Sequence, residues 1–171
     1  MLTEKQQKMI SVLETHIKAE LDGDLETTMR AMSDNPHLLH VPTIAGGYGN
    51  EGVKNFYKNH LVGKFFPPDV EMKRVSVTVG DNQIVEELVI SFTHTAVIDW
   101  MLPNVPPTGR RVEAGFAVIV GFKDDKVSHE HIYWDQASVL VQIGLLDPTG
   151  LPVNGAKSAQ TVLNPEEILT N

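Results

Sequence analysis

Hydrophobic residues recur at helical spacing in the first part of the chain. Thr3 and Gln6 stand three residues apart, which is the spacing of a capping box at the start of a helix. The apolar positions that follow share one helical face, and the helix is expected to end at Gly23. These positions are Met9, Ile10, Leu13, Ile17 and Leu21.

The next stretch predicts a second helix, a short strand and a third helix. Asp24 can cap the second helix, and the Asn-Pro pair at 35–36 is expected to break it. Residues 37–41 are apolar and flanked by helix breakers, which favours a strand. A flexible glycine-rich loop is expected at 46–49, followed by an amphipathic helix that Asn50 can cap. The apolar face of this third helix consists of Val53, Phe56, Tyr57 and Leu61.

The hydrophobic pattern then changes from helical to alternating. Residues 70–79 and 84–98 are rich in β-branched side chains and flank a Gly-Asp-Asn turn, which predicts a hairpin. A proline-rich loop follows at 101–110. Two further strands are expected at 112–122 and 126–134, joined by a tight turn.

Asp135 is expected to cap a last helix over residues 136–145. Helices at the start and hairpin-linked strands after them predict an α+β fold. We expect one domain over residues 1–146, in which N-terminal helices close a curved antiparallel sheet into a cone. Residues 147–171 are expected to form a tail, either extended or with a short helix near 156–163. Such a cone encloses a cavity, the default place for a small ligand.

Composition excludes several classes of function. The 171 residues include 14 Lys and Arg against 22 Asp and Glu, and this net charge of -8 disfavours nucleic acids and anionic membranes. The chain has no cysteine, so it has neither disulfides nor thiolate chemistry, and a cytoplasmic location is expected. No apolar run approaches the roughly 18 residues of a membrane span. Neither a phosphate-binding glycine loop nor a Gly-x-Ser-x-Gly elbow occurs in the sequence.

Three short motifs, together with the order of elements, resemble one known group of proteins. The motifs are Pro-Pro-Thr-Gly-Arg-Arg at 106–111, Asp-Lys-Val at 125–127 and Gln-Ile-Gly at 142–144. They resemble the SnoaL-like group of the nuclear transport factor 2-like (NTF2-like) superfamily, which includes polyketide cyclases. The resemblance covers roughly residues 5–146, the size of one domain. It implies the cone-shaped, cystatin-like α+β fold and a homodimer that pairs through the outer face of the sheet.

The resemblance also implies acid/base chemistry without a cofactor or a metal. In the cyclases an aspartate on the last strand removes a proton next to a carbonyl group. By spacing, that position falls on Ile132 here, and an isoleucine cannot transfer a proton. Strand side chains alternate, so Glu130, Ile132 and Trp134 share a face, which by the resemblance looks into the cone.

Glu130 is therefore the first candidate for a base that has moved along the strand. Burial raises the pKa of a carboxyl group, which suits a general base or a neutral acid near pH 7. The alternative is a structural ion pair with Arg110, Arg111 or a histidine. The second catalytic candidate is His94, at the end of an otherwise apolar strand face. The residues expected to bind the ligand are His40, Tyr48, Glu86, Phe92, Trp100, Phe116, Ile132 and Trp134.

Two histidines raise the question of a metal site. His129 and His131 share a strand face, and Asp135 follows, a spacing that resembles the cupin motif. Cupins, however, are double-sheet barrels without leading helices. By the resemblance these imidazoles point away from the cavity, and with Tyr133 they suit a dimer interface. We expect no metal and no cofactor, and we expect His16 to be a packing or surface residue.

These features predict a cofactor-free acid/base enzyme that acts on a small, largely apolar carbonyl compound, as an isomerase, a cyclase or a hydratase. The expected base is Glu130 or His94, and the other residue or His40 would donate a hydrogen bond to the developing oxyanion. Two alternatives stay open, because a fold does not determine a function. They are a non-catalytic small-molecule binding protein and a protein-interaction module.

Overall fold

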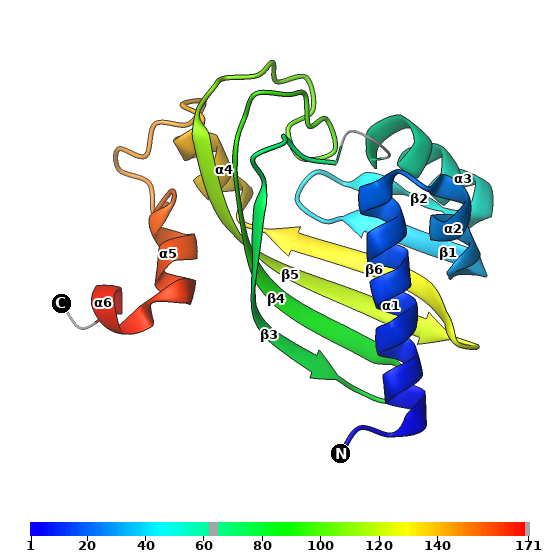
Figure 1. The fold of residues 1–171 in the computed structure, drawn as a ribbon. Coiled ribbons are helices and arrows are strands. Elements are labelled where there is room, and N and C mark those ends of the chain that lie inside the picture. The colour runs from blue at the N-terminus through cyan, green and yellow to red at the C-terminus, as the bar shows by residue number, and fades with distance from the viewer. Residues whose placement is uncertain (62–64, 170–171) are drawn as a thin grey trace.

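A strongly curved sheet, with helix α1 lying across its concave face, dominates the molecule (Figure 1). The computed structural model describes residues 1–61 and 65–169. The elements in these residues are α1 (Glu4–Asp22), α2 (Leu25–Arg30), β1 (Met32–His40), β2 (Ala45–Tyr48), α3 (Gly49–Phe56), a π-helical turn (Tyr57–Leu61), β3 (Glu71–Val79), β4 (Gln83–Thr93), β5 (Arg111–Lys123), β6 (Lys126–Trp134), α4 (Gln136–Gln142), α5 (Lys157–Leu163) and α6 (Pro165–Leu169).

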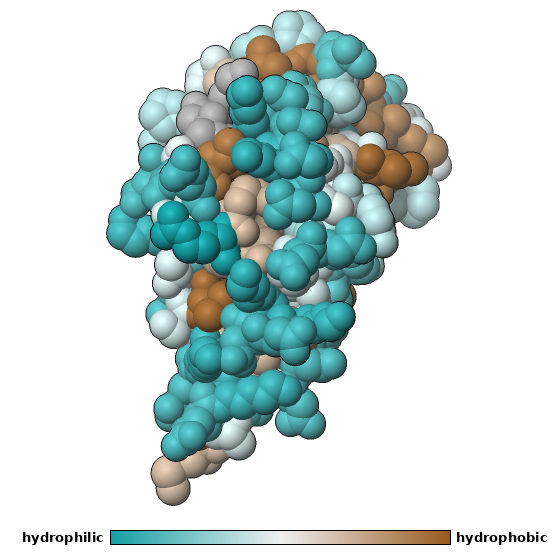
Figure 2. All heavy atoms as spheres, turned by 90° about the vertical axis from the view of Figure 1, so that its right-hand side faces the viewer, coloured by the Kyte–Doolittle hydropathy of each residue, from teal (hydrophilic) through white to brown (hydrophobic). Residues whose placement is uncertain are grey.

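Helix α1 forms where the hydrophobic spacing predicts it. The Thr3 hydroxyl accepts a hydrogen bond from the Gln6 backbone N–H at 3.2 Å, and the Gln6 side chain accepts from the Thr3 N–H at 3.0 Å. Gly23 ends the helix with a left-handed φ of 75°. The side of the molecule that carries α1 and α2 is mostly hydrophilic, with few hydrophobic patches (Figure 2). The buried face of α1 includes two polar residues, as its members are Met9, Leu13, His16, Ala19 and Glu20.

The segment between α1 and α3 differs from the prediction. Helix α2 ends at Arg30, and β1 begins at Met32 and continues through Pro36. The register between β1 and β6 shifts between Met32 and His37, and this irregularity accommodates a proline, which has no N–H to donate to a ladder. The Asn-Pro pair therefore lies inside a strand instead of ending a helix.

The glycine-rich stretch at 46–49 is also more ordered than predicted. Its first residues belong to β2, which pairs with β1 in an antiparallel hairpin. Helix α3 begins at Gly49, with Tyr48 in the N-cap position and no hydrogen bond from a capping side chain. The prediction that Asn50 caps this helix is wrong, because the helix has already begun at that residue.

The six strands follow the spatial order β2-β1-β6-β5-β4-β3. The pairs β3–β4, β4–β5 and β5–β6 are antiparallel, as predicted, and so is the unpredicted pair β1–β2, whereas β1 and β6 run parallel, so the sheet is mixed. Asp124 and Asp125, with φ of 51° and 60°, form the tight turn between β5 and β6. This register directs Glu130 and Ile132 into the concave face.

Strand β4 ends at Thr93, five residues earlier than predicted for the 84–98 stretch. The chain then forms a loop between β4 and β5, at the top of Figure 1. Several large side chains of this loop are fully buried: Ile98, Trp100, Met101 and Leu102. The loop therefore contributes to the core instead of extending the sheet.

The tail packs against the outer face of the sheet of its own chain. The Asp135 carboxylate caps α4 by accepting from the Ser138 N–H at 3.1 Å, as predicted. Helix α5 covers part of β4 and β5, and its Gln160 amide donates to the Glu113 carboxylate at 3.2 Å. The short helix predicted near 156–163 is thus present, and the homodimer stays a prediction. Among the described residues, no helix combines the length and the apolar character that a membrane crossing requires.

Candidate functional site

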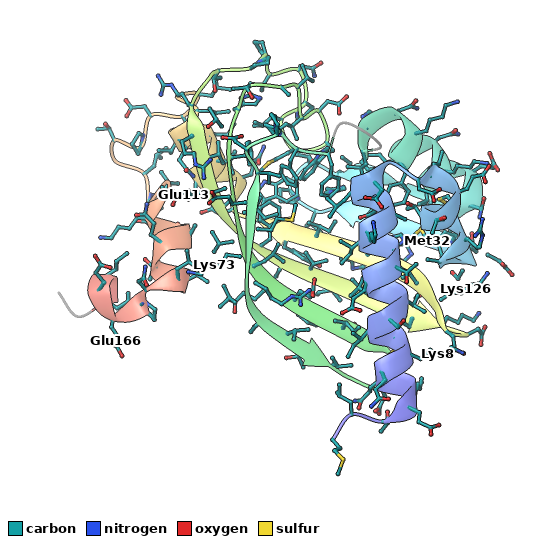
Figure 3. All side chains as sticks on the ribbon, viewed as in Figure 1. Lys8, Met32, Lys73, Glu113, Lys126 and Glu166 are labelled. Atoms are coloured by element: carbon teal, nitrogen blue, oxygen red, sulfur yellow. The ribbon has the colours of Figure 1, made fainter. Side chains whose placement is uncertain are left out.

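A cavity of about 280 Å³ lies between helix α1 and the concave face of the sheet. Figure 3 shows the side chains of α1 and of the strands filling the space around it. Most of its lining is apolar, contributed by Leu13, Ile17, Leu21, Phe65, Phe66, Met72, Leu88, Ile90, Trp100, Phe116, Val118, Val120 and Ile132. The polar side chains that line it are Glu20, His40, Arg74, Glu86 and Glu130.

The structure brings most of the predicted site residues to this cavity. Those that line it are His40, Glu86, Trp100, Phe116, Glu130 and Ile132. Two more lie directly behind the lining: the Trp134 ring is 5.5 Å from the Phe116 ring, and the Phe92 ring is 5.4 Å from the Phe66 ring, between centroids. Ile132, at the position where the sequence resemblance places the cyclase aspartate, lines the cavity and cannot transfer a proton.

Two predicted site residues lie elsewhere. His94 is fully buried under the loop after β4, where its Nδ1 is 3.1 Å from the Thr108 hydroxyl, and it is not among the cavity-lining residues. The backbone of His94 still pairs with the 109–110 segment, and its ring packs there against Thr108. Tyr48 is 73% exposed on the edge strand β2, and its hydroxyl accepts from the Asn35 amide at 3.1 Å.

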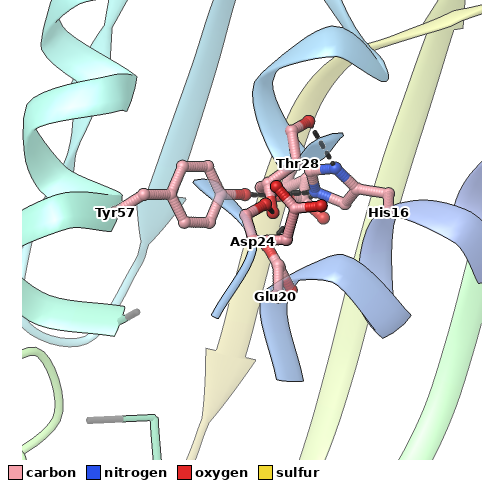
Figure 4. A network of polar contacts seen from close by, with 6 residues as sticks. His16, Glu20, Asp24, Thr28 and Tyr57 are labelled. Atoms are coloured by element: carbon pink, nitrogen blue, oxygen red, sulfur yellow. Dashed lines mark hydrogen bonds and ion pairs between the residues drawn. The ribbon is translucent and has the colours of Figure 1, made fainter. Parts of the chain in front are cut away.

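Glu130, on β6, belongs to a buried polar network with His16 and Tyr57. Figure 4 shows His16 and Tyr57 of this network from close by. Glu130 is only 5% exposed. The Tyr57 hydroxyl donates to Glu130 Oε2 at 2.7 Å, and His16 Nε2 lies 3.4 Å from the same oxygen. The predicted arginine partners are not used: Arg111 pairs with Asp69 at 3.2 Å, and the Arg110 guanidinium lies over Gly144.

The contacts of His16 favour a proton on both ring nitrogens. Nδ1 lies 3.1 Å from the Thr28 carbonyl oxygen, and Nε2 lies 3.2 Å from Glu20 Oε1 as well as near Glu130. Carbonyl and carboxylate oxygens only accept, so both nitrogens donate and the ring is an imidazolium. Burial lowers the pKa of His16, but the two carboxylates outweigh burial and raise that pKa well above its ordinary value.

His16 in turn reverses the predicted direction of the Glu130 pKa. Burial is the largest influence and raises the pKa, but the charge of His16 and the hydrogen bonds from His16 and Tyr57 together lower it. Glu130 is therefore an ionised carboxylate at neutral pH, and the prediction of a raised pKa is wrong. Burial, followed by the nearby carboxylates, raises the pKa of Tyr57, so the phenol keeps its proton and donates it.

His40 lies at the end of β1 and is 1% exposed. Its Nδ1 donates to the Ala45 carbonyl at 3.3 Å, and burial lowers its pKa to about 4. The ring is therefore neutral near pH 7, with its single proton on Nδ1 and a lone pair on Nε2. Its position beside the Trp100 ring, 4.6 Å between centroids, keeps it in the wall of the cavity. Because that proton is already engaged, His40 cannot donate to an oxyanion as predicted.

Sequence reasoning missed His16, Glu20 and Tyr57. A signal was available for the first two, because Met9, Leu13, His16 and Glu20 follow one another at three- and four-residue spacing on one helical face. Titratable residues on a buried stripe point to a polar network. Tyr57 gave no such signal, since a tyrosine on an apolar helix face is most often a packing residue.

The same network is the group of described residues that could hold a metal ion. One ligand atom each from His16, Glu20 and Glu130 lies within 4.8 Å of the others. One imidazole and two carboxylates suit divalent transition metals. In this structure the His16 imidazolium supplies the positive charge between the two carboxylates.

His129 and His131 lie on the outer sheet face with His37, whose Nε2 is 2.9 Å from that of His131.

Replacing Tyr57 by Phe is expected to lower the free energy of unfolding by about 1.5–3 kcal/mol, the range for a hydrogen bond to a charged group. The ring still fills its site, so the loss reports on the hydroxyl bound to Glu130. Denaturant unfolding measures it, with Tyr133→Phe as the control, because Tyr133 is 40% exposed. Equal stability of the two variants would show that the Tyr57 hydroxyl does not hold Glu130.

Comparisons with known proteins show the fold. No family model matches the chain, and no curated protein matches it. A candidate SnoaL-like polyketide cyclase from Jannaschia Sp. CCS1 superposes with a TM-score of 0.66 at 15% identity, over 86% of this chain and 99% of that one. For IdmH, a candidate polyketide cyclase from Streptomyces antibioticus, the TM-score is 0.58 at 21% identity, over 80% and 98%.

A further solved structure carries a ligand. It is a hypothetical protein with a ketosteroid isomerase-like fold from Catenulispora acidiphila DSM 44928, in complex with trimethylamine. It superposes with a TM-score of 0.58 at 12% identity, over 79% of this chain and 93% of that one. These likenesses confirm the cone-shaped fold that the sequence motifs indicate.

Proposed function

We propose that this chain, which has the fold of the NTF2-like and SnoaL-like proteins, is a cofactor-free acid/base enzyme that moves a proton on a small, largely apolar ligand. The observation that carries the proposal is a buried, ionised carboxylate, Glu130, that opens on an apolar cavity. Glu130 is ionised and therefore ready to accept a proton, and its exclusion from water strengthens its electrostatic interactions with a ligand in the cavity. The cyclases and ketosteroid isomerase-like proteins among the similar structures support the isomerase or cyclase class.

The contacts of Glu130 assign separate roles to its two oxygens. Oε2 accepts from Tyr57 and faces His16, which leaves Oε1 as the atom for the ligand. In the proposed step Oε1 takes a proton from the carbon next to a C=O or C=N group. The electron pair of the broken C–H bond moves onto the heteroatom of that group. Return of the proton to a conjugated carbon then gives an isomer, without a net gain or loss of atoms.

His16 and Tyr57 act on the ligand only through Glu130. Neither belongs to the lining of the cavity, so both are positioning residues. His16 also connects Glu130 to Glu20, a second carboxylate that does line the cavity. This arrangement keeps Glu130 charged in a site where burial alone would protonate it.

Deuterium exchange tests the proposal without knowledge of the natural substrate. The probes are 1-phenylpropan-2-one and 1,2-dimethyl-3,4-dihydroisoquinolinium, which have acidic C–H bonds next to C=O and C=N⁺ respectively. Proton NMR in D₂O is expected to show faster loss of these protons with the protein than with buffer, and EDTA is expected to leave the rate unchanged. Exchange of both probes at the buffer rate contradicts the proposal and favours a non-catalytic binding protein.

A further inference from the structure

The polar groups around the cavity are almost all hydrogen-bond acceptors. Glu20, Glu86 and Glu130 present carboxylates, and His40 presents the lone pair of Nε2. The indole N–H of Trp100 donates to the Phe65 carbonyl at 3.2 Å and is therefore engaged. Among the described lining residues only Arg74 still offers donors. A ligand that fits these groups has to bring its own N–H or O–H donors or a positive charge.

The charged groups around the cavity also favour a cationic ligand. Three carboxylates line the cavity, and the cations that oppose them are His16 and Arg74, so one negative charge is in excess. The side chain of Arg74 is 58% exposed at the mouth and forms an ion pair with Glu86 at 2.7 Å. Arg74 therefore balances the charge of Glu86, which is 8% exposed, whereas Glu20 and Glu130, at 9% and 5% exposure, share the single positive charge of His16.

The aromatic part of the wall fits a cation as well. The rings that line the cavity are Phe65, Phe66, Trp100 and Phe116. The Phe65 and Phe66 rings lie 6.0 and 5.3 Å from the Trp100 ring, between centroids, so the three rings form one aromatic cluster in the wall. The faces of such rings attract cationic groups, and Trp attracts them most strongly.

We infer that the cavity selects a ligand with a positively charged nitrogen on a small apolar body, such as an iminium or a substituted ammonium compound. This inference rests on the proposed function, because it names the substrate class of the same Glu130 site. A cationic C=N⁺ group accepts the electron pair from a neighbouring C–H bond without an oxyanion donor. The inference thereby accounts for a site in which neither His40 nor His94 offers that donor.

Two probes of the same shape test the inference. Benzyltrimethylammonium is a cation, and neopentylbenzene is its neutral counterpart with carbon in place of nitrogen. Binding is measured by the fluorescence of the tryptophans, since Trp100 lines the cavity. The cation is expected to bind the wild-type protein at least ten-fold more tightly, a difference of about 1.4 kcal/mol. Equal affinities, tighter binding of the neutral probe or binding of neither probe overturns the inference.

Removal of one charged side chain from the cavity is the second test of the inference. Glu20→Gln is expected to reduce the preference for the cation at least five-fold and to leave the affinity for neopentylbenzene unchanged. The matched control is Glu14→Gln on the same helix, where the side chain is exposed, and it should keep the preference. If Glu20→Gln does not fold, Glu86→Gln is used, since its loss also leaves the cavity less negative. A preference that survives in these cavity variants overturns the inference.

The binding experiment tests the cationic ligand class and the exchange experiment tests the acid/base function, so the failure of one can be told from the failure of the other. Equal binding of the two probes, together with exchange that depends on Glu130, removes the cationic class and leaves the acid/base function. A strong preference for the cation, together with exchange of both carbon acids at the buffer rate, removes catalysis and leaves a cation-binding pocket.

Discussion

Glu130→Gln is expected to lower the protein-catalysed exchange rate by about 10²–10⁴-fold, the usual contribution of a general base. Glutamine has the shape of glutamate and can still accept from the Tyr57 hydroxyl through its carbonyl oxygen. It cannot take a proton from carbon. The NMR exchange assay measures the loss, and tryptophan fluorescence with neopentylbenzene, the neutral probe, shows whether the cavity still admits a ligand.

The matched control for this variant is Glu87→Gln. Glu87 lies on strand β4 of the same sheet but is exposed, and it is not among the cavity-lining residues. The same chemical change there is expected to leave the exchange rate at the wild-type value. Wild-type exchange in a folded Glu130→Gln protein would remove Glu130 as the base and with it the proposed mechanism.

His16→Ala is expected to lower the free energy of unfolding by about 3–5 kcal/mol at pH 7, the cost of breaking a buried ion pair by removing one partner. The variant leaves Glu20 and Glu130 facing each other without the cation between them. Denaturant unfolding measures the loss. Lys18→Ala, which breaks an exposed ion pair with Asp22 on the same helix, is the control and should change stability far less.

The deficit of His16→Ala is expected to depend on pH. In the wild type the folded-state pKa of Glu130 is lowered, so its stabilisation is present above the unfolded pKa and is lost as the pH falls through the folded value. In the variant the charge and the hydrogen bond of His16 no longer oppose burial, so the pKa of Glu130 is higher than in the wild type and the folded protein loses less stability as the pH falls. The difference between the two proteins should therefore be smaller at pH 4 than at pH 7. A difference that does not change with pH would contradict the ion pair.

The sheet and its faces could be predicted because the alternation of side chains is a local property. The bounds of β6, residues 126–134, and the inward direction of Glu130 follow from the alternating pattern and the tight turn before it. The prediction failed where local patterns end. The position of His94 was extrapolated from a strand face that stops at Thr93, and a loop then determines where the side chain lies.

The charged network could not be predicted as a whole, because its members come from three distant parts of the chain. His16, Tyr57 and Glu130 are separated by 41 and 73 residues in sequence. The direction of the Glu130 pKa depends on this tertiary contact, so burial alone predicted the wrong sign. The sequence does not reveal that His16 lies beside Glu130, so it does not indicate which carboxylates stay ionised.

The motifs that carry the family resemblance have structural roles. A Cβ added at Gly144 would lie 2.4 Å from the Arg110 side chain, so the glycine leaves room for the guanidinium. The Gln142 amide donates to the Glu113 carbonyl at 2.9 Å and accepts from its N–H at 2.8 Å, which fixes α4 against β5. These residues hold the fold, and the residues around the cavity differ from the cyclase pattern at Ile132. For this reason the sequence predicts the architecture more completely than the chemistry.

The ionisation of Glu130 tests the central claim most directly. In protein labelled with ¹³C at the glutamate side-chain carboxyl groups, comparison with Glu130→Gln identifies its NMR signal. The signal is expected to have the chemical shift of a carboxylate at pH 7 and to titrate below the ordinary glutamate value of 4.5. A protonated Glu130 at pH 7 would contradict the account, because a neutral carboxyl group cannot serve as the base in this cavity.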